Sequence, residues 1–127
     1  MKLFILIFML FCHIVDDYYL QGLLAQLKQK SWWKENYPNK MYQYDYLIAL
    51  IEHSFSWAFM IMLPIFVVMY KTDNYRPLFY CLAILLNMVV HSIIDHLKAN
   101  CKKFGLLVDQ LLHIIQIVIT WLVYIIT

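Results

Sequence analysis

Two short motifs near the C-terminus contain the same residue types in opposite order. His91 and Asp95 stand four residues apart, and after a basic segment Asp109 and His113 repeat this spacing with the types reversed. Residues four apart lie on one face of an α-helix. If two antiparallel helices start from one bend, the two aspartates lie at the same distance from the bend, and the two histidines lie one turn further from it. Both kinds of side chain bind divalent metal ions.

Other residues of the same chemistry extend this pattern. His13 and Asp17 form a third pair with a spacing of four, and His53 lies alone in another apolar segment. The candidate metal ligands are therefore His13, Asp17, His53, His91, Asp95, Asp109 and His113. Buried together, these carboxylates and imidazoles would need protons or a cation to balance their charge.

The ligand types indicate which metal such a site would take. Nitrogen and oxygen ligands favour a divalent transition metal, Zn²⁺ first with Mn²⁺ or Fe²⁺ as alternatives, over Ca²⁺ or Mg²⁺. The three cysteines lie outside the pattern, which argues against a closed structural zinc site. Seven ligands exceed the four of one tetrahedral ion, so one ion and two ions about 3.5–4 Å apart are both open. A hydrogen-bond network without metal is the structural alternative.

Further polar residues follow the same helical faces. Each could orient a ligand or form a plain hydrogen bond between helices. They are Gln21, Ser56, Asn87, Lys98 and Gln116. Three ionisable residues lie beside the pattern, and we expect them at the membrane interface, in packing contacts or in an outer layer of the site. They are Asp16, Glu52 and His96.

The composition indicates the environment that must position these residues. Of 127 residues, 64% are hydrophobic and 14% are charged, against averages of about 45–50% and about 25% in soluble domains. A water-soluble domain of this size could not bury so much apolar surface, so the expected solvent is lipid. The net charge of +2 is too small and too scattered to indicate nucleic-acid binding.

Four apolar segments are each near the roughly 20 residues that cross a bilayer. They span about residues 3–27, 46–70, 78–97 and 104–126. Backbone groups in lipid must be satisfied within the segment, which predicts helices. The first segment lacks a small-residue cleavage site, so we interpret it as a retained helix. The expected fold is all-α, a single four-helix transmembrane bundle over residues 1–127 with the His/Asp site in its cytoplasmic half.

The distribution of basic residues predicts the orientation of the bundle. Seven of the ten lie in the first and third connections, which the positive-inside rule places in the cytoplasm. These seven are Lys28, Lys30, Lys34, Lys40, Lys98, Lys102 and Lys103. The first connection is also rich in Trp and Tyr, which is typical of a headgroup-level anchor. A lid over the site is the alternative.

Taken in order, four sequence blocks resemble those of a small bacterial and phage polytopic membrane-protein family of unknown function. The blocks are HIVDDYYLQ, the isolated His53, HSIIDHLK and DQLLH, and they cover nearly the whole chain. The resemblance implies a bacterial inner membrane. Members often carry a second His four residues after the one that matches His53, whereas this chain has Trp57. The second helix is therefore expected to supply a single ligand.

The favoured function is a metal-dependent membrane hydrolase with a lipid or phosphoester substrate. Asp17 or Asp95 would act as general base, and Lys98 would hold an anionic group. The arrangement is similar, in logic and not in sequence, to membrane-embedded zinc hydrolases of the ceramidase and adiponectin-receptor superfamily. The alternative is a non-enzymatic membrane factor with a structural metal or hydrogen-bond site. Transport is disfavoured because ionisable residues are missing from the outer half of the bundle.

Overall fold

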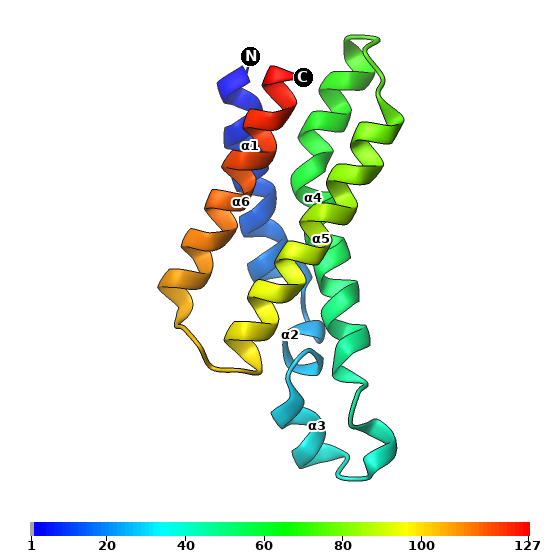
Figure 1. The fold of residues 1–127 in the computed structure, drawn as a ribbon, viewed down its shortest axis with the longest axis vertical. Coiled ribbons are helices and arrows are strands. Elements are labelled where there is room, and N and C mark those ends of the chain that lie inside the picture. The colour runs from blue at the N-terminus through cyan, green and yellow to red at the C-terminus, as the bar shows by residue number, and fades with distance from the viewer. Residues whose placement is uncertain (1) are drawn as a thin grey trace.

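The computed structural model describes residues 2–127, and every regular element within them is helical. Four long helices form the bundle: α1 (Lys2–Val15, continued by the π-helical turn η1, Asp16–Leu20), α4 (Tyr46–Lys71), α5 (Pro77–Ala99) and α6 (Leu106–Ile126). Helix α1 packs against α4 and α6, and α5 packs against the same two, so the four helices close a ring (Figure 1). The predicted all-α fold is confirmed.

The two ends of the bundle differ in what they carry. The chain termini and the α4–α5 turn lie at one end, which we call the terminal end (Figure 1). The α5–α6 bend and the segment that joins α1 to α4 lie at the other end, which we call the connection end. That segment contains α2 (Leu24–Leu27), α3 (Lys30–Asn36) and the 3₁₀ turn η2 (Lys40–Tyr42).

Three of the four helices match their predicted spans within two residues, but the first ends at Leu20 and not near Leu27. Two local features end it. In η1 the amide of Gln21 donates to the carbonyl of Asp16, which widens the last turn. Gly22 then adopts a φ of +46°, which glycine reaches without a steric penalty. The chain therefore turns back beneath the bundle.

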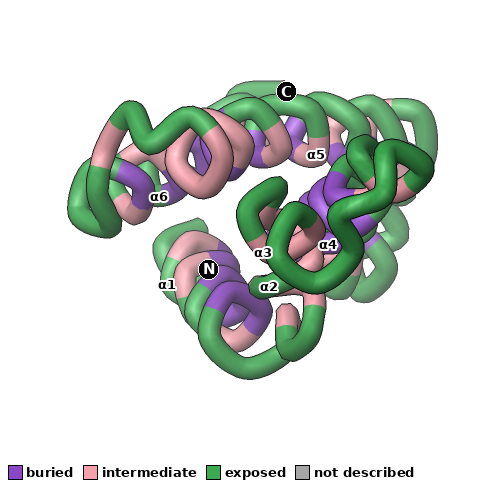
Figure 2. Tube along the Cα trace, turned by 90° about the horizontal axis from the view of Figure 1, so that it is seen from below, coloured by how far each residue is buried: buried purple, intermediate pink, exposed green. Residues whose placement is uncertain are grey.

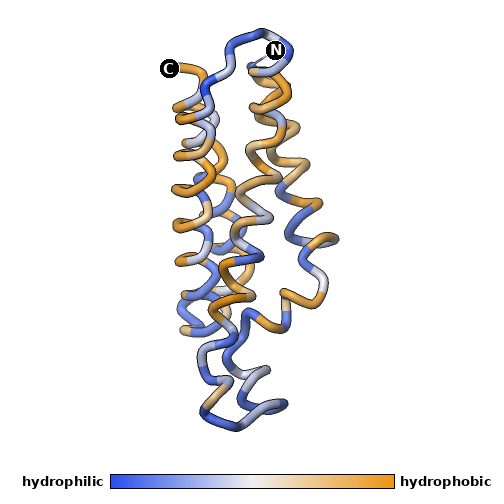
Figure 3. The backbone as a smooth tube through the Cα atoms, turned by 90° about the vertical axis from the view of Figure 1, so that its right-hand side faces the viewer, coloured by the Kyte–Doolittle hydropathy of each residue, from blue (hydrophilic) through white to orange (hydrophobic). Residues whose placement is uncertain are grey.

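The interior divides into an apolar half and a polar half. Toward the terminal end, the core consists of side chains such as Met9, Ile61, Ile65, Met69 and Ile117, all fully buried. Toward the connection end, hydrophilic residues enter the helices (Figure 3). The apolar half therefore supplies packing, whereas the polar half contains every candidate ligand.

The outer surface of the bundle is apolar on all four long helices. Exposed side chains include Phe8, Phe55, Leu86 and Ile119, and Figure 2 shows the buried residues facing inward with the exposed ones outside. Each of the four helices is long and apolar enough to cross a membrane. An apolar outer surface on such helices indicates that the chain is a helical membrane protein.

An aromatic cluster organises the connection between α1 and α4. Trp33 packs against Trp32, Tyr37 and Tyr42, with ring centroids 5.1–6.4 Å apart. The Trp33 indole also donates to the carbonyl of Leu27 at 2.7 Å. Trp and Tyr favour the headgroup region of a bilayer, so this cluster gives the connection a compact structure directly below the polar half.

The apolar core makes a first prediction about stability. Ile61→Ala removes a fully buried side chain and should lower the free energy of unfolding by about 2–5 kcal/mol. Ile119→Ala removes the same atoms from a side chain that is 56% exposed on the outer surface, and it should have little effect. SDS titration in mixed micelles, followed by circular dichroism, measures both. Equal losses would contradict the inward and outward faces described above.

Candidate metal centre

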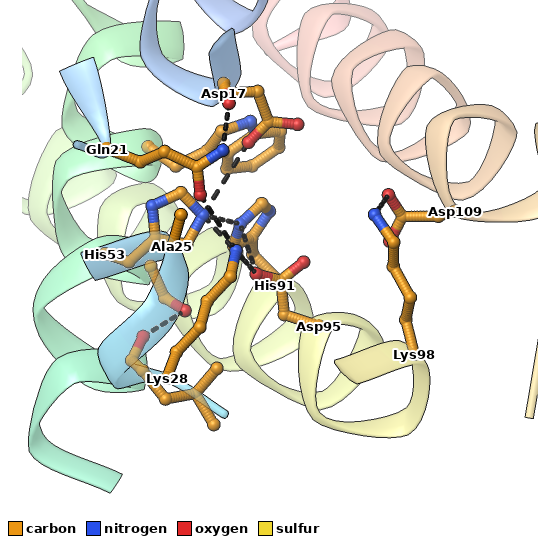
Figure 4. Close-up of polar contacts among 12 residues, drawn as sticks. Asp17, Gln21, Ala25, Lys28, His53, His91, Asp95, Lys98 and Asp109 are labelled. Carbon is orange, nitrogen blue, oxygen red and sulfur yellow. Dashed lines mark hydrogen bonds and ion pairs between the residues drawn. The ribbon is translucent and has the colours of Figure 1, made fainter. Parts of the chain in front are cut away.

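The candidate ligands meet in the polar half, and all four long helical segments of the ring contribute to them. Asp17 lies on η1, His53 on α4, His91 and Asp95 on α5, and Asp109 and His113 on α6; all are buried. Figure 4 shows His53, His91, Asp95 and Asp17 converging, with Asp109 set to one side. The spacing of four residues on α5 and α6 thus brings both pairs to one depth, as the reversed motifs require.

One group of ligand atoms surrounds the Nε2 atom of His53. This atom lies 3.2 Å from Nε2 of His91, 3.4 Å from Oδ2 of Asp95 and 3.6 Å from Oδ1 of Asp17. Asp17, His53 and His91 each offer one ligand atom within 4.8 Å of the others. Metal–ligand bonds of about 2.0–2.1 Å give a tetrahedron with edges of about 3.3–3.4 Å. The observed separations are therefore close to those around a single Zn²⁺-sized ion.

A second group shares residues with the first. Nε2 of His113 lies 3.4 Å from Oδ1 of Asp95 and 3.4 Å from Oδ1 of Asp109. His91, Asp95 and His113 form another set of ligand atoms within 4.8 Å. The two oxygens of Asp95 thus face different groups, Oδ2 toward His53 and Oδ1 toward His113. This is the arrangement of a carboxylate that can bridge two cations.

Several of these buried atoms have no hydrogen-bond partner. They include both ring nitrogens of His113 and Oδ1 of Asp109. Leaving a buried polar atom unpaired costs about 1–3 kcal/mol. The Nε2 atom of His113 and Oδ1 of Asp109 face each other at 3.4 Å without a hydrogen bond. A shared cation would satisfy both atoms, so the residues present fit a metal ion.

Aromatic stacking holds the His91 ring in place. The ring lies between Trp57 and His113, with centroid separations of 4.2 Å on both sides and interplanar angles of 20° and 27°. Trp57 stands four residues after His53 on α4. Its indole ring stacks on His91 and cannot bind a metal ion, so α4 offers one ligand, His53.

His13 is engaged at both ring nitrogens. The Trp57 indole donates to Nδ1 at 2.8 Å, so Nε2 carries the proton of the neutral ring and donates to Oε1 of Gln110 at 3.1 Å. Gln110 in turn donates to Oδ2 of Asp17 and of Asp109, both at 3.2 Å. The structure therefore places His13 beside the ligand groups, where it orients Gln110 and, through it, two carboxylates.

Asp16 is fully buried, and the interfacial alternative for this residue is therefore wrong. Its Oδ1 accepts a hydrogen bond from Ser56 at 2.6 Å, and its Oδ2 lies 3.8 Å from Nδ1 of His53. Neither Oδ2 of Asp16 nor Nδ1 of His53 has a hydrogen-bond partner, so Asp16 acts on His53 by its charge and not through a hydrogen bond. The opposite nitrogen of His53, Nε2, points into the first group.

Two lysines supply positive charge to the cluster. Nζ of Lys28 lies 2.5 Å from Oδ2 of Asp95, and Nζ of Lys98 lies 2.6 Å from Oδ2 of Asp109 (Figure 4). The site contains four buried carboxylates, those of Asp16, Asp17, Asp95 and Asp109, and the two ammonium groups pair with Asp95 and Asp109. With neutral imidazoles, a formal excess of two negative charges remains, which one divalent cation would balance.

Lys28 reaches the site because the connection between α1 and α4 is fastened to the α5–α6 bend. The amide group of Asn100 donates to the carbonyl of Lys28 at 3.0 Å and accepts from the backbone of Lys30 at 2.7 Å. Gln21 accepts from Nζ of Lys28 at 3.1 Å, and its own amide donates to the carbonyl of Asp17. The connection therefore contributes a charged residue to the site, as a lid would.

The remaining polar residues fall in two places. Gln116 and Thr120 of α6 both donate to Asn87 of α5, at 2.8–3.0 Å, deeper in the bundle than the ligands. This network joins α5 to α6. Glu52 is exposed, and the His96 ring stacks on Tyr46, with centroids 6.0 Å apart. His96 is thus a packing residue, as expected.

Sequence reasoning missed Lys28, Gln110 and Trp57 as parts of the site. The sequence predicts for Lys28 only a place in a cytoplasmic connection, although its half-buried side chain pairs with Asp95. Gln110 had a usable signal, because it directly follows Asp109 and stands three residues before His113. For Trp57 the sequence indicated only the absence of a second histidine four residues after His53, and not that its ring stacks on His91.

Comparisons with curated proteins and with solved structures found no match. One family model, described as "Protein of unknown function (DUF3307)", matches residues 5–127 and so covers all the ligands named above. The chain therefore belongs to the DUF3307 family, whose function is unknown.

Proposed function

We propose that this chain is a membrane-embedded, metal-dependent hydrolase that acts near the cytoplasmic face on a lipid or phosphoester substrate. One observation carries the proposal. The two oxygens of Asp95 face separate sets of imidazole nitrogens, at separations of 3.4 Å from His53 and His113 that suit ligands of a common ion and not hydrogen bonds. We assign Zn²⁺, as one or two ions, with Mn²⁺ or Fe²⁺ as alternatives.

The proposed ligands divide according to the two groups. Asp17, His53 and His91 would hold one ion, and Asp109 and His113 would complete a second position, with Asp95 between them. A divalent metal ion lowers the pKa of a bound water to about 7 and polarises a carbonyl or phosphoryl oxygen. Both effects favour hydrolysis, which is also accelerated by a group that accepts a proton from the water.

Asp17 is the best placed of the carboxylates to act as general base. Its side chain is 10% exposed, more than that of any other carboxylate in the cluster. Its Oδ2 accepts a hydrogen bond from Gln110, which holds the carboxylate in a fixed orientation. Asp95, in contrast, has both oxygens among imidazoles and Lys28, so we assign it to metal binding and not to proton transfer.

A cavity of about 590 Å³ between α1 and α6 supports access from the bilayer. Exposed Ile14, Tyr18 and Tyr19 line its outer part, and His13 and Gln110 form its inner wall. Gln110 contacts Asp17. A lipid substrate could therefore reach the proposed base without first crossing the aqueous phase.

Metal content provides the most direct test of the site. The purified protein should hold about one to two equivalents of a transition metal, measured by elemental analysis after removal of free ions. His91→Ala should lose it, because His91 belongs to both ligand groups. His96→Ala is the matched control on the same helix and should retain it. A folded wild-type protein without metal, or equal losses in both variants, would contradict the metal centre.

Turnover tests the hydrolase. Metal-loaded wild type should hydrolyse bis(p-nitrophenyl) phosphate or alter a bacterial lipid extract analysed by mass spectrometry. Asp17→Asn, compared with wild type at equal metal occupancy, should lower the rate about 10²–10⁴-fold, because the amide no longer accepts a proton. Asp73→Asn is the control, because Asp73 lies on the α4–α5 turn at the terminal end of the bundle, away from the site. Absence of any hydrolysis by metal-loaded protein would favour a structural metal in a non-enzymatic membrane factor.

The proposed orientation is testable with a native residue. Cys101 is exposed on the α5–α6 bend. A membrane-impermeant maleimide should label it only after the cells are permeabilised, because the connection end is expected in the cytoplasm. In a Cys101→Ser background, Asn74→Cys on the α4–α5 turn should react in intact cells. The reverse labelling pattern would place the site at the outer face of the membrane.

A further inference from the structure

A second cavity, of about 290 Å³, opens beside the metal ligands at the connection end. Its polar walls are Gln21, Lys28, Gln29, Asp95, Lys98 and Lys102. Pockets for drug-sized ligands measure about 300–1,000 Å³, so this volume suits a small headgroup better than a whole lipid. Asp95 is common to the cavity and to both ligand groups, so an occupant would lie directly against the proposed metal centre.

Three lysines around one carboxylate make this cavity a site for an anion. Lys28 and Lys98 are paired with Asp95 and Asp109, but the Lys98 side chain remains 33% exposed. Lys102 has no ion-pair partner within residues 2–127 and adopts a φ of +54°. A non-glycine residue in this region costs of order 1 kcal/mol or more, and here it stands on the cavity wall.

A metal ion in the neighbouring groups would change the pairing of these lysines. Asp95 and Asp109, once bound to a divalent cation, no longer depend on ammonium groups for charge balance. Lys28 and Lys98 would then be available to an anion, together with Lys102. A phosphate group carries a charge of about −1.5 to −2 and three acceptor oxygens, which matches three ammonium donors better than a single carboxylate does.

We propose that the substrate carries a phosphate group and that Lys28, Lys98 and Lys102 bind this group in the cavity beside Asp95. The inference rests on the proposed hydrolase and names its substrate class. It also predicts coupling between the two sites, because the metal releases the lysines that the phosphate uses. Each ligand should then raise the affinity of the other by the same factor.

The experiment uses the full chain in a maltoside detergent, which contains no phosphate. Inorganic phosphate is titrated into metal-loaded and metal-free protein by calorimetry, after excess metal has been removed. Lys102→Met should weaken phosphate binding about tenfold, the value expected for one charge-assisted contact. Lys103→Met, the adjacent lysine on the same bend and not part of the cavity wall, should change it less than about twofold.

Two results would overturn the pocket: equal effects of the two lysine variants, or phosphate affinity that does not change between metal-loaded and metal-free protein. Circular dichroism of each variant excludes unfolding as the cause. The pocket and the metal centre can also fail separately. If the protein takes up no metal but binds phosphate in a way that depends on Lys102, only the proposed metal centre is contradicted. If the protein binds metal but Lys102→Met does not change phosphate binding, only the proposed phosphate pocket is contradicted.

A lipid and a soluble source of the phosphate are compared directly. Phosphatidic acid in mixed micelles and glycerol 3-phosphate in solution carry the same phosphate on the same glycerol unit. At least tenfold tighter binding of phosphatidic acid, with the same dependence on Lys102, assigns the pocket to a lipid headgroup. Equal affinity assigns it to a soluble phosphate ester. Binding of neither compound would reject a phosphate-bearing substrate.

Discussion

Buried negative charge is the constraint on which this structure depends. Four carboxylates lie within a bundle whose outer surface is apolar, and an unpaired ion in such a medium costs several kcal/mol. Lys28 and Lys98 offset part of this charge from two sides. Because the connection between α1 and α4 folds back beneath the helices, Lys28 reaches Asp95. A divalent cation fits the charge that remains.

The division of the bundle into two halves separates stability from chemistry. The apolar half packs residues such as Met9, Ile61 and Ile117 without polar atoms to satisfy. The polar half has several unpaired buried atoms around His113 and Asp109, and each such atom lowers the stability of the fold. A structure with a well-packed half can tolerate such a site in the other. Trp57 joins the two, because it belongs to the apolar core and also stacks on His91.

Much of the fold and of the candidate site was predictable because both follow simple periodicities. Apolar runs of about 20 residues predicted α4, α5 and α6 within two residues, and the four-residue spacings predicted which side chains share a depth. The predicted end of the first helix is wrong, because a single π-turn and the positive φ of Gly22 outweigh the apolar pattern that continues to Leu27. For Asp16 the sequence left a place at the interface and a place in an outer layer of the site both open, because burial of one of two adjacent aspartates depends on the phase of that turn.

Composition and the helical repeat were sufficient to predict the helical class, the membrane environment and the convergence of six side chains. These are Asp17, His53, His91, Asp95, Asp109 and His113. Only the tertiary structure decided which ring nitrogens remain free. His13 uses both of its nitrogens for Trp57 and Gln110, whereas Nε2 of His113 has no partner. Only the structure brought Lys28 to Asp95, through the contacts of Asn100 with a segment some seventy residues away. Contacts of this kind depend on how loops close against helices, and no periodicity in the sequence encodes them.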